Sequence, residues 1–279
     1  MIGIDYLGDS VSLPHRFRSP FVSLEYGILR VEDHSLLLDR KDGSGIEIPV
    51  GMISAILLEP GVSVTHEAIK LAAEHDVLLL WVGEAGVRVY SSGMPGGKSG
   101  KRIVRQALQH ANAENRMFAA GRLYRLMFGE NLPQSRSLEK LRGMEGARVR
   151  ALYARIAHEY DVQWNGRDRA DKALQDALGI ATSCLYGLSE AVILTAGFSP
   201  AIGIVHSGDP RSLVFDLADT IKFKTVVPAA FRAFKESPID TKNRVRRVCR
   251  DLFRENDTAA VLFDHLYEIL GPDVVGSAS

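Results

Sequence analysis

The spacing of hydrophobic residues divides the chain into two parts with different predicted secondary structure. In residues 21–90, short apolar segments alternate with turn residues, which predicts β-strands over 22–31, 36–39, 47–50, 54–58, 77–82 and 87–90. The pair Asp42-Gly43 is typical of a hairpin turn. One helix, which Thr65 can cap, interrupts the strands before Val77.

From Lys101 onward the apolar residues recur at helical spacing, which predicts helices over 101–128, 138–160, 173–196, 212–223, 228–235, 244–253 and 258–270. The stretch between the two parts, 93–100, holds four glycines and one proline. We therefore expect an α+β fold. A small β-rich N-terminal domain (1–92), β-sandwich-like with one helix, precedes a Gly-rich linker (93–100), an all-α C-terminal domain (101–272) and a frayed tail (273–279).

Charge is distributed unevenly along the chain, although the total is balanced at 34 basic and 34 acidic residues. Residues 1–92 carry 13 acidic and 7 basic side chains, so the remainder carries 21 and 27, and the two parts are near −6 and +6. A basic half has the sign that attracts phosphates, although a solvated basic surface is an equally good interpretation.

Several classes of protein are disfavoured. The two cysteines, Cys184 and Cys249, lie in helical patterns without metal-ligand spacing, which indicates buried free thiols in a reducing cytosol. No secretory signal is visible, and the longest apolar runs fall far short of the roughly 20 residues that a membrane-spanning helix needs. We therefore expect a cytoplasmic protein that does not associate with a membrane. The stretch Gly97-Lys98-Ser99 follows a strand, but Ser92 replaces the glycine that a phosphate-binding loop requires.

Four residues of the second part are candidates for metal-dependent phosphate chemistry. Glu145 lies mid-helix between glycines, His206 ends an apolar run at a turn, and Asp216 and Asp219 lie three residues apart on one helical face. A bound cation would relieve the repulsion between these two acids. The oxygen ligands suit Mg²⁺, and an added imidazole shifts the preference toward Mn²⁺.

Each candidate also has an ordinary structural explanation. Glu145 could pair with neighbouring arginines, His206 could be a hydrogen-bonded core residue, and the two aspartates could pair with Lys222 or Arg211. A structural zinc site is disfavoured because neither cysteine has the spacing. A serine–histidine–acid triad is disfavoured because Ser207 directly follows His206 and no nucleophile elbow exists.

Basic residues outside this group are candidates for phosphate contacts. They are Arg88 near the end of the β-rich part and, within one predicted helix, Arg244, Arg246, Arg247 and Arg250. Because Arg246 and Arg250 are four residues apart, they could follow a phosphate backbone, although a solvated face is as good an explanation. Tyr186 is a core residue by default, but its hydroxyl needs a partner if it is buried.

Longer motifs carry a family resemblance. They are 141–146 (LRGMEG), 181–187 (ATSCLYG), 200–206 (PAIGIVH) and 215–219 (FDLAD) followed by 225–228 (TVVP). With them the chain resembles the CRISPR-associated integrases of spacer acquisition, the Cas-one family, in the branch that accompanies Cascade-type complexes. The resemblance covers nearly the whole chain.

The resemblance implies a dimerising β-sandwich-like domain and an α-helical catalytic domain. It places the metal ligands at Glu145, His206 and Asp219, with Asp216 in support and Tyr186 near the site. It also implies DNA contacts by Arg88, Lys222 and Arg246. Asn243 departs from the basic residue that relatives often have, and Arg244 or Arg247 could replace that contact.

The implied reaction is transesterification, in which the 3′-hydroxyl of a short foreign DNA attacks a phosphodiester at the edge of a CRISPR repeat, with Mg²⁺ or Mn²⁺ as cofactor. The same site would act as an endonuclease with water. The implied assembly is two integrase dimers bridged by a dimer of a small ferredoxin-like partner. A stand-alone nuclease on branched DNA and a non-catalytic DNA-binding scaffold remain alternatives.

Overall fold

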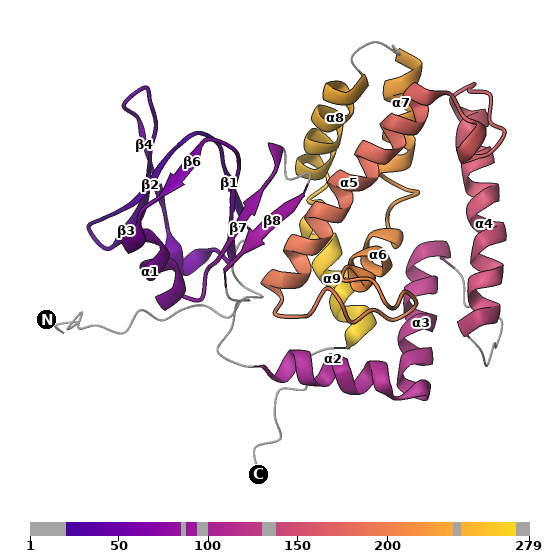
Figure 1. Ribbon diagram of the computed structural model, residues 1–279, viewed down its shortest axis with the longest axis horizontal. Helices are drawn as coiled ribbons and strands as arrows, with labels where there is room; N and C mark the ends of the chain where they lie inside the picture. Colours follow the sequence, from indigo (N-terminus) through magenta and orange to yellow (C-terminus); the bar gives the residue numbers. More distant parts are fainter. Residues whose placement is uncertain (1–20, 85–87, 94–99, 130–137, 237–240, 272–279) are drawn as a thin grey trace, which may run out of the picture.

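A computed structural model describes residues 21–84, 88–93, 100–129, 138–236 and 241–271. The strands lie together on one side of the molecule and most of the helices on the other, so the predicted α+β fold class is confirmed (Figure 1). Three predictions fall wholly or partly outside the described residues: residue 87 of the strand predicted over 87–90, most of the predicted linker, and the whole predicted tail. The predicted domain limits therefore stay a prediction.

Two four-stranded sheets form the N-terminal part. One has the order β1-β5-β7-β8, made of β1 (Val22–Leu24), β5 (Ala55–Leu58), β7 (Leu78–Val82) and β8 (Val89–Ser92). The other has the order β4-β3-β2-β6, made of β2 (Gly27–Glu32), β3 (Ser35–Asp39), β4 (Gly45–Ile48) and β6 (Val62–Val64). Helix α1 (His66–Glu74) packs with both sheets, and Thr65 caps it by accepting a hydrogen bond from the Ala68 amide. The η2 turn (Val50–Met52) follows β4.

Strand β5 is buried on both faces, which explains its unbroken apolar sequence. Ile56 and Leu58 face the core between the sheets, whereas Ala55 and Leu57 pack in a second cluster with Ala191 of helix α5 (Lys172–Thr195). This second cluster fixes the β-rich part against the central helix of the helical part.

The single strand predicted over 22–31 is wrong, because it is two strands in different sheets. The chain turns at Tyr26, whose φ of 51° is left-handed, and at Gly27, whose φ is 149°. A Cβ atom on Gly27 would lie 2.5 Å from the carbonyl oxygen of Asp39, so only glycine fits. The short strand β6 was not predicted.

The helical part surrounds α5 (Lys172–Thr195), which is buried along most of its length (Figure 1). The other helices are α2 (Lys101–Ala111), α3 (Ala113–Phe128), α4 (Leu138–Glu159), α6 (Ser212–Asp219), α7 (Val226–Glu236), α8 (Thr241–Glu255) and α9 (Thr258–Leu270), with a short η4 turn (Arg167–Arg169) before α5. By length and composition α5 could cross a membrane, a property that the sequence analysis did not identify. However, 67% of its apolar window is buried inside the protein, as in the core helix of a globular domain.

Most predicted helices differ from the observed ones by one to three residues at an end, and two differ more. The helix predicted over 101–128 is interrupted at Asn112, which leaves helical geometry at ψ 117° and accepts a hydrogen bond from the Asn115 amide at 2.9 Å. The helix predicted over 212–223 ends at Asp219, and the Thr220 hydroxyl donates to the Leu217 carbonyl at 2.6 Å. Both differences matter for the site. The interruption at Asn112 lets α2 and α3 approach it separately, and the early end of α6 places Asp219 at a helix terminus.

Replacing Asn112 with alanine removes the cap of α3, and we expect the free energy of unfolding to fall by about 1 kcal/mol in urea denaturation. Asn112→Asp keeps a side-chain acceptor and should restore most of that stability. Equal losses in both variants would contradict a capping role.

Candidate functional site

The loop that carries His206 connects α5 to α6 and is held by side chains from distant helices. Gln106, a buried residue of α2, donates to the carbonyls of Ser199 and Ile202 at 2.8 and 2.7 Å. Its amide oxygen accepts from the Ser199 amide at 2.8 Å. One side chain thus satisfies three backbone groups that have no partner within a strand or helix.

Further carbonyls of the same loop are satisfied by α2, α3 and α4. The Gly203 carbonyl accepts from His110 at 2.6 Å, the Ile204 carbonyl from Arg116 at 2.7 Å, and the Val205 carbonyl from Arg142. Burial lowers the pKa of Arg116, and Arg142 adds repulsion. The carbonyls of the loop therefore have hydrogen-bond partners, as they would in a helix or strand, although the loop has no regular structure.

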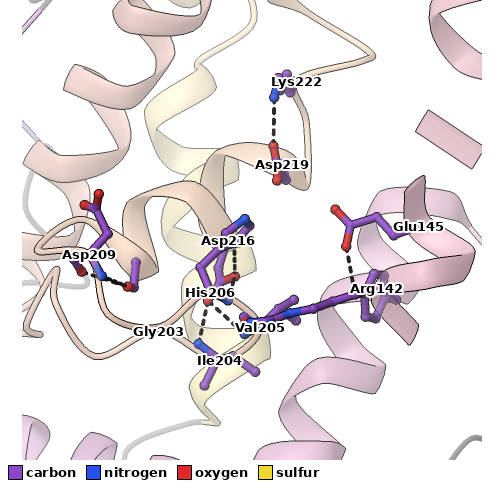
Figure 2. A network of polar contacts seen from close by, with 12 residues as sticks. Arg142, Glu145, Gly203, Ile204, Val205, His206, Asp209, Asp216, Asp219 and Lys222 are labelled. Atoms are coloured by element: carbon purple, nitrogen blue, oxygen red, sulfur yellow. Dashed lines mark hydrogen bonds and ion pairs between the residues drawn. The ribbon is translucent and has the colours of Figure 1, made fainter. Parts of the chain in front are cut away.

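Asp216 binds the amides of this loop with one fully buried carboxylate (Figure 2). Its Oδ2 accepts from the amides of Ile204 and Val205, the latter at 3.2 Å. Its Oδ1 accepts from the amide of His206 at 3.0 Å and contacts the Nδ1 of the same residue at 2.8 Å. With four bonds, this carboxylate has little capacity left for a metal, so Asp216 acts as a positioning residue.

The close approach of the loop to α6 requires Gly203. A Cβ atom there would lie 2.5 Å from the His206 carbonyl oxygen and 2.9 Å from Asp216 Oδ2. A side chain at this position would push the amides away from Asp216.

His206 is oriented by its bond to Asp216. With Nδ1–H donating to the carboxylate, the other ring nitrogen, Nε2, remains available as a ligand or a proton acceptor. The hydrogen bond to Asp216 raises the pKa of His206 above its ordinary value, and burial opposes this shift. The ring also packs edge-on against Phe215, with centroids 5.6 Å apart.

Glu145 approaches from α4 (Figure 2). The hydroxyl of Tyr124 on α3 donates to its Oε2 at 2.8 Å. Burial raises the pKa of Glu145, whereas the Tyr124 bond lowers it and the nearby charge of Asp219 raises it. Burial and the charge of Glu145 together raise the pKa of Tyr124. The hydroxyl therefore stays protonated and keeps donating.

Asp219 forms an ion pair with Lys222 at 3.2 Å, and each side chain is 13% exposed. Burial disfavours the charge on Lys222, but Asp219 and two tyrosines, Tyr186 and Tyr153, favour it more, so its pKa is raised. The ordinary explanation for Asp219, a pair with Lys222, is thus realised. The pair also offsets the unfavourable placement of a carboxylate at a helix C-terminus.

Glu145, His206 and Asp219 come from three segments and extend around one space (Figure 2). Glu145 lies close enough to His206, Asp216 and Asp219 for their charges to shift its pKa. Among the described residues, no three His, Cys, Asp or Glu side chains are close enough to form a ready-made metal centre. The donor types nevertheless fit a hard divalent cation, with two carboxylates and one imidazole whose second nitrogen is already fixed.

Tyr186 contacts this group indirectly, through Phe215. Its ring packs on Phe215 with centroids 5.0 Å apart, and Phe215 in turn contacts His206. Burial raises the pKa of Tyr186, and Asp219 contributes in the same direction while Lys222 opposes it.

The predicted DNA-binding arginines are not gathered at this group. Arg246, Arg247 and Arg250 line a cavity of about 460 Å³ between α8 and the β-rich part, together with acidic side chains such as Glu84. Arg246 lies 3.9 Å from Glu84, and Arg244 donates to the Ala233 carbonyl at 3.4 Å. Exposed Arg88 precedes β8. Lys222 is the predicted DNA-binding residue that contacts a candidate metal ligand, because it pairs with Asp219.

Sequence reasoning missed Gln106, Arg116, Tyr124 and Arg142. These residues occupy ordinary positions in helical patterns and gain their roles only from contacts across the fold. The two cysteines are buried and free, as predicted.

Comparison with known proteins identifies the family. The family model for CRISPR associated protein Cas1 matches residues 21–128 and 122–247. The CRISPR-associated endonuclease Cas1 of Escherichia coli (strain K12) is 45% identical over 264 residues, which cover 92% of this chain and 87% of that protein. The chain belongs to the Cas1 family.

Solved structures agree with this assignment. The TtCas1-DNA complex has a TM-score of 0.82 at 34% identity and covers 94% of this chain and 100% of that one. A casposase bound to integration product has a TM-score of 0.58 at 14% identity, with 90% and 96% covered, and shares the fold.

Asp216→Asn should remove the pH dependence that the His206–Asp216 pair gives to stability. Because the pair raises the pKa of His206, its stabilisation is fully present below about pH 6.5 and is lost as pH rises through the folded pKa. We expect the difference in unfolding free energy between wild type and variant to shrink as pH rises from about 5.5 to 8.5. Asp209→Asn, a half-buried control on the same loop that keeps a side-chain acceptor for the Arg211 amide, should not change this dependence. A pH-independent difference for Asp216→Asn would refute the pairing.

Proposed function

We propose that this Cas1-family protein is a metal-dependent DNA integrase of CRISPR adaptation. In this proposal the 3′-hydroxyl ends of short foreign DNA are joined to the CRISPR repeat by transesterification, and an endonuclease activity uses the same residues. The observation that carries the proposal is the convergence of Glu145, His206 and Asp219, with His206 fixed by a buried carboxylate. The named activity of the Escherichia coli relative and the DNA in the TtCas1 complex support it.

The cofactor that suits these donors is Mg²⁺ or Mn²⁺, which when bound would lower the pKa of the attacking hydroxyl and neutralise the phosphate oxygens. Glu145 and Asp219 would supply oxygen ligands and His206 its Nε2. Because no three donors are within ligand distance among the described residues, ion binding would have to draw them together. Asp216 would keep the histidine ring oriented during that change.

Lys222 contributes a fixed positive charge beside Asp219. If Asp219 turns toward a cation, the ammonium is left next to the place where a phosphodiester would lie, and it can bind a nonbridging oxygen. Tyr186 packs on Phe215, which contacts His206, and would in this way support the position of the His206 ring.

DNA binding would extend over Arg88 and the α8 arginines Arg244, Arg246, Arg247 and Arg250. We also propose that the chain acts as a homodimer, and that a small ferredoxin-like partner joins two such dimers in the cytoplasm. A composite surface of this kind would explain how a chain with zero formal net charge can hold DNA.

The test is strand transfer with purified protein, its partner, Mg²⁺ or Mn²⁺, a short DNA with free 3′-hydroxyls and a repeat-bearing plasmid. We expect a loss of more than about 100-fold in strand-transfer product for each of three variants, Glu145→Ala, His206→Ala and Asp219→Ala, because each removes a proposed metal ligand. Glu139→Ala, an exposed glutamate in the first turn of α4, is the matched control and should keep full activity.

The alternatives give different results. Cleavage of branched DNA without any joined product would favour a stand-alone nuclease. Undiminished metal-dependent activity in all three variants would remove the proposed site, and absence of any reaction together with DNA binding would favour a scaffold.

A further inference from the structure

A buried tyrosine near the candidate site carries a hydroxyl without a hydrogen-bond partner. Tyr153 lies on α4, roughly two helical turns after Glu145, and is 7% exposed. Its hydroxyl finds no hydrogen-bond partner among the described residues. Because a buried hydroxyl without a partner is destabilising, its presence beside a candidate site calls for an explanation.

Aromatic contacts place Tyr153 next to Lys222. The Tyr153 ring stacks on Trp164 with centroids 5.1 Å apart and meets Phe223 edge-on at 5.2 Å. The Lys222 Nζ lies 5.6 Å from the centre of the same Phe223 ring. Burial lowers the pKa of Lys222, Asp219 raises it most, and Tyr153 is close enough to add to the increase. Two rings thus fix the tyrosine, and one of them also contacts the ammonium.

The Lys222 ammonium depends on a single carboxylate. It has three N–H donors, and among the described residues the structure shows one bond, to Asp219 Oδ1 at 3.2 Å. The Lys222 side chain is 13% exposed, so water can replace a lost partner only in part. If Asp219 turns to another partner, the charge is left unpaired in a place where that is costly. A neutral acceptor close by would offset part of this cost.

We propose that Tyr153 is a positioning residue whose hydroxyl accepts a hydrogen bond from Lys222 when Asp219 leaves the ion pair. The inference rests on the proposed function, in which Asp219 turns toward a divalent cation. The hydroxyl has no partner while the pair is closed, because its donor becomes free only when the pair opens. Lys222 then stays beside the site and does not turn into solvent.

The first test is a double-mutant cycle in EDTA, read as the midpoint of urea unfolding of the full chain. Tyr153→Phe removes a hydroxyl that has no partner while Asp219 is paired, so the midpoint should stay the same or rise. In the Asp219→Ala background the hydroxyl is the acceptor left for Lys222, and the same substitution should lower the midpoint. Tyr160→Phe is the matched control. This half-buried tyrosine directly follows α4 and stacks on Phe231, and its substitution should have the same effect in both backgrounds.

The second test is affinity for Mn²⁺ alone, measured by electron paramagnetic resonance of the free ion. Tyr153→Phe should weaken binding about tenfold, because nothing then compensates the opening of the ion pair. In the Lys222→Met background the same substitution should change nothing, since the hydroxyl has lost its donor.

Equal shifts of the urea midpoint in the wild-type and Asp219→Ala backgrounds would overturn the proposal, because Tyr153 would then act independently of the ion pair. Unchanged Mn²⁺ affinity in Tyr153→Phe would overturn it as well. The cycle contains neither metal nor DNA. Failure of the wild-type protein to bind Mn²⁺ would therefore refute the proposed function, while the cycle still decides the role of Tyr153.

Discussion

The buried carboxylate of Asp216 is the constraint on which the candidate site depends. A buried charge is costly unless hydrogen bonds satisfy it, and here three consecutive amides and one imidazole do so. The same bonds shape the loop between α5 and α6 and orient His206. Gln106, His110, Arg116 and Arg142 satisfy the carbonyls of that loop, so helices α2, α3 and α4 are tied to α6 through a segment without regular structure.

This arrangement gives the two aspartates of α6 different tasks. Asp216 points into the protein and positions the loop, whereas Asp219 lies at the helix end and pairs with Lys222. Glu145 reaches the same space from α4 with a tyrosine holding one of its oxygens. The candidate ligands thus come from separate parts of the helical bundle, each with its own support. The β-rich part is joined to this bundle through the doubly buried strand β5 and α5.

Fold class and most of the helices could be predicted from sequence, because hydrophobic periodicity is a local signal. Glycine-flanked or clustered polar residues made Glu145, His206, Asp216 and Asp219 candidates, and their roles in a reaction stay a prediction. The predicted helix and strand boundaries are wrong where a single residue overrides the hydrophobic pattern. Asn112 does so by capping α3, and Gly27 by allowing the chain to turn into another sheet. The unequal roles of Asp216 and Asp219 do not follow from their spacing, which puts both on one face. Tyr124 and Gln106 could not be found, because their partners are 21 and more than 90 residues away.

The most direct test of the account is hydrogen exchange at the amides of Ile204, Val205 and His206. These amides belong to a loop, yet their bonds to Asp216 predict slow exchange comparable to that of the neighbouring helices, and Asp216→Asn should abolish this protection while the core of α5 stays protected. Exchange of the three wild-type amides at the rate of a solvated loop would contradict the account, since Asp216 could then not be what holds His206 in place.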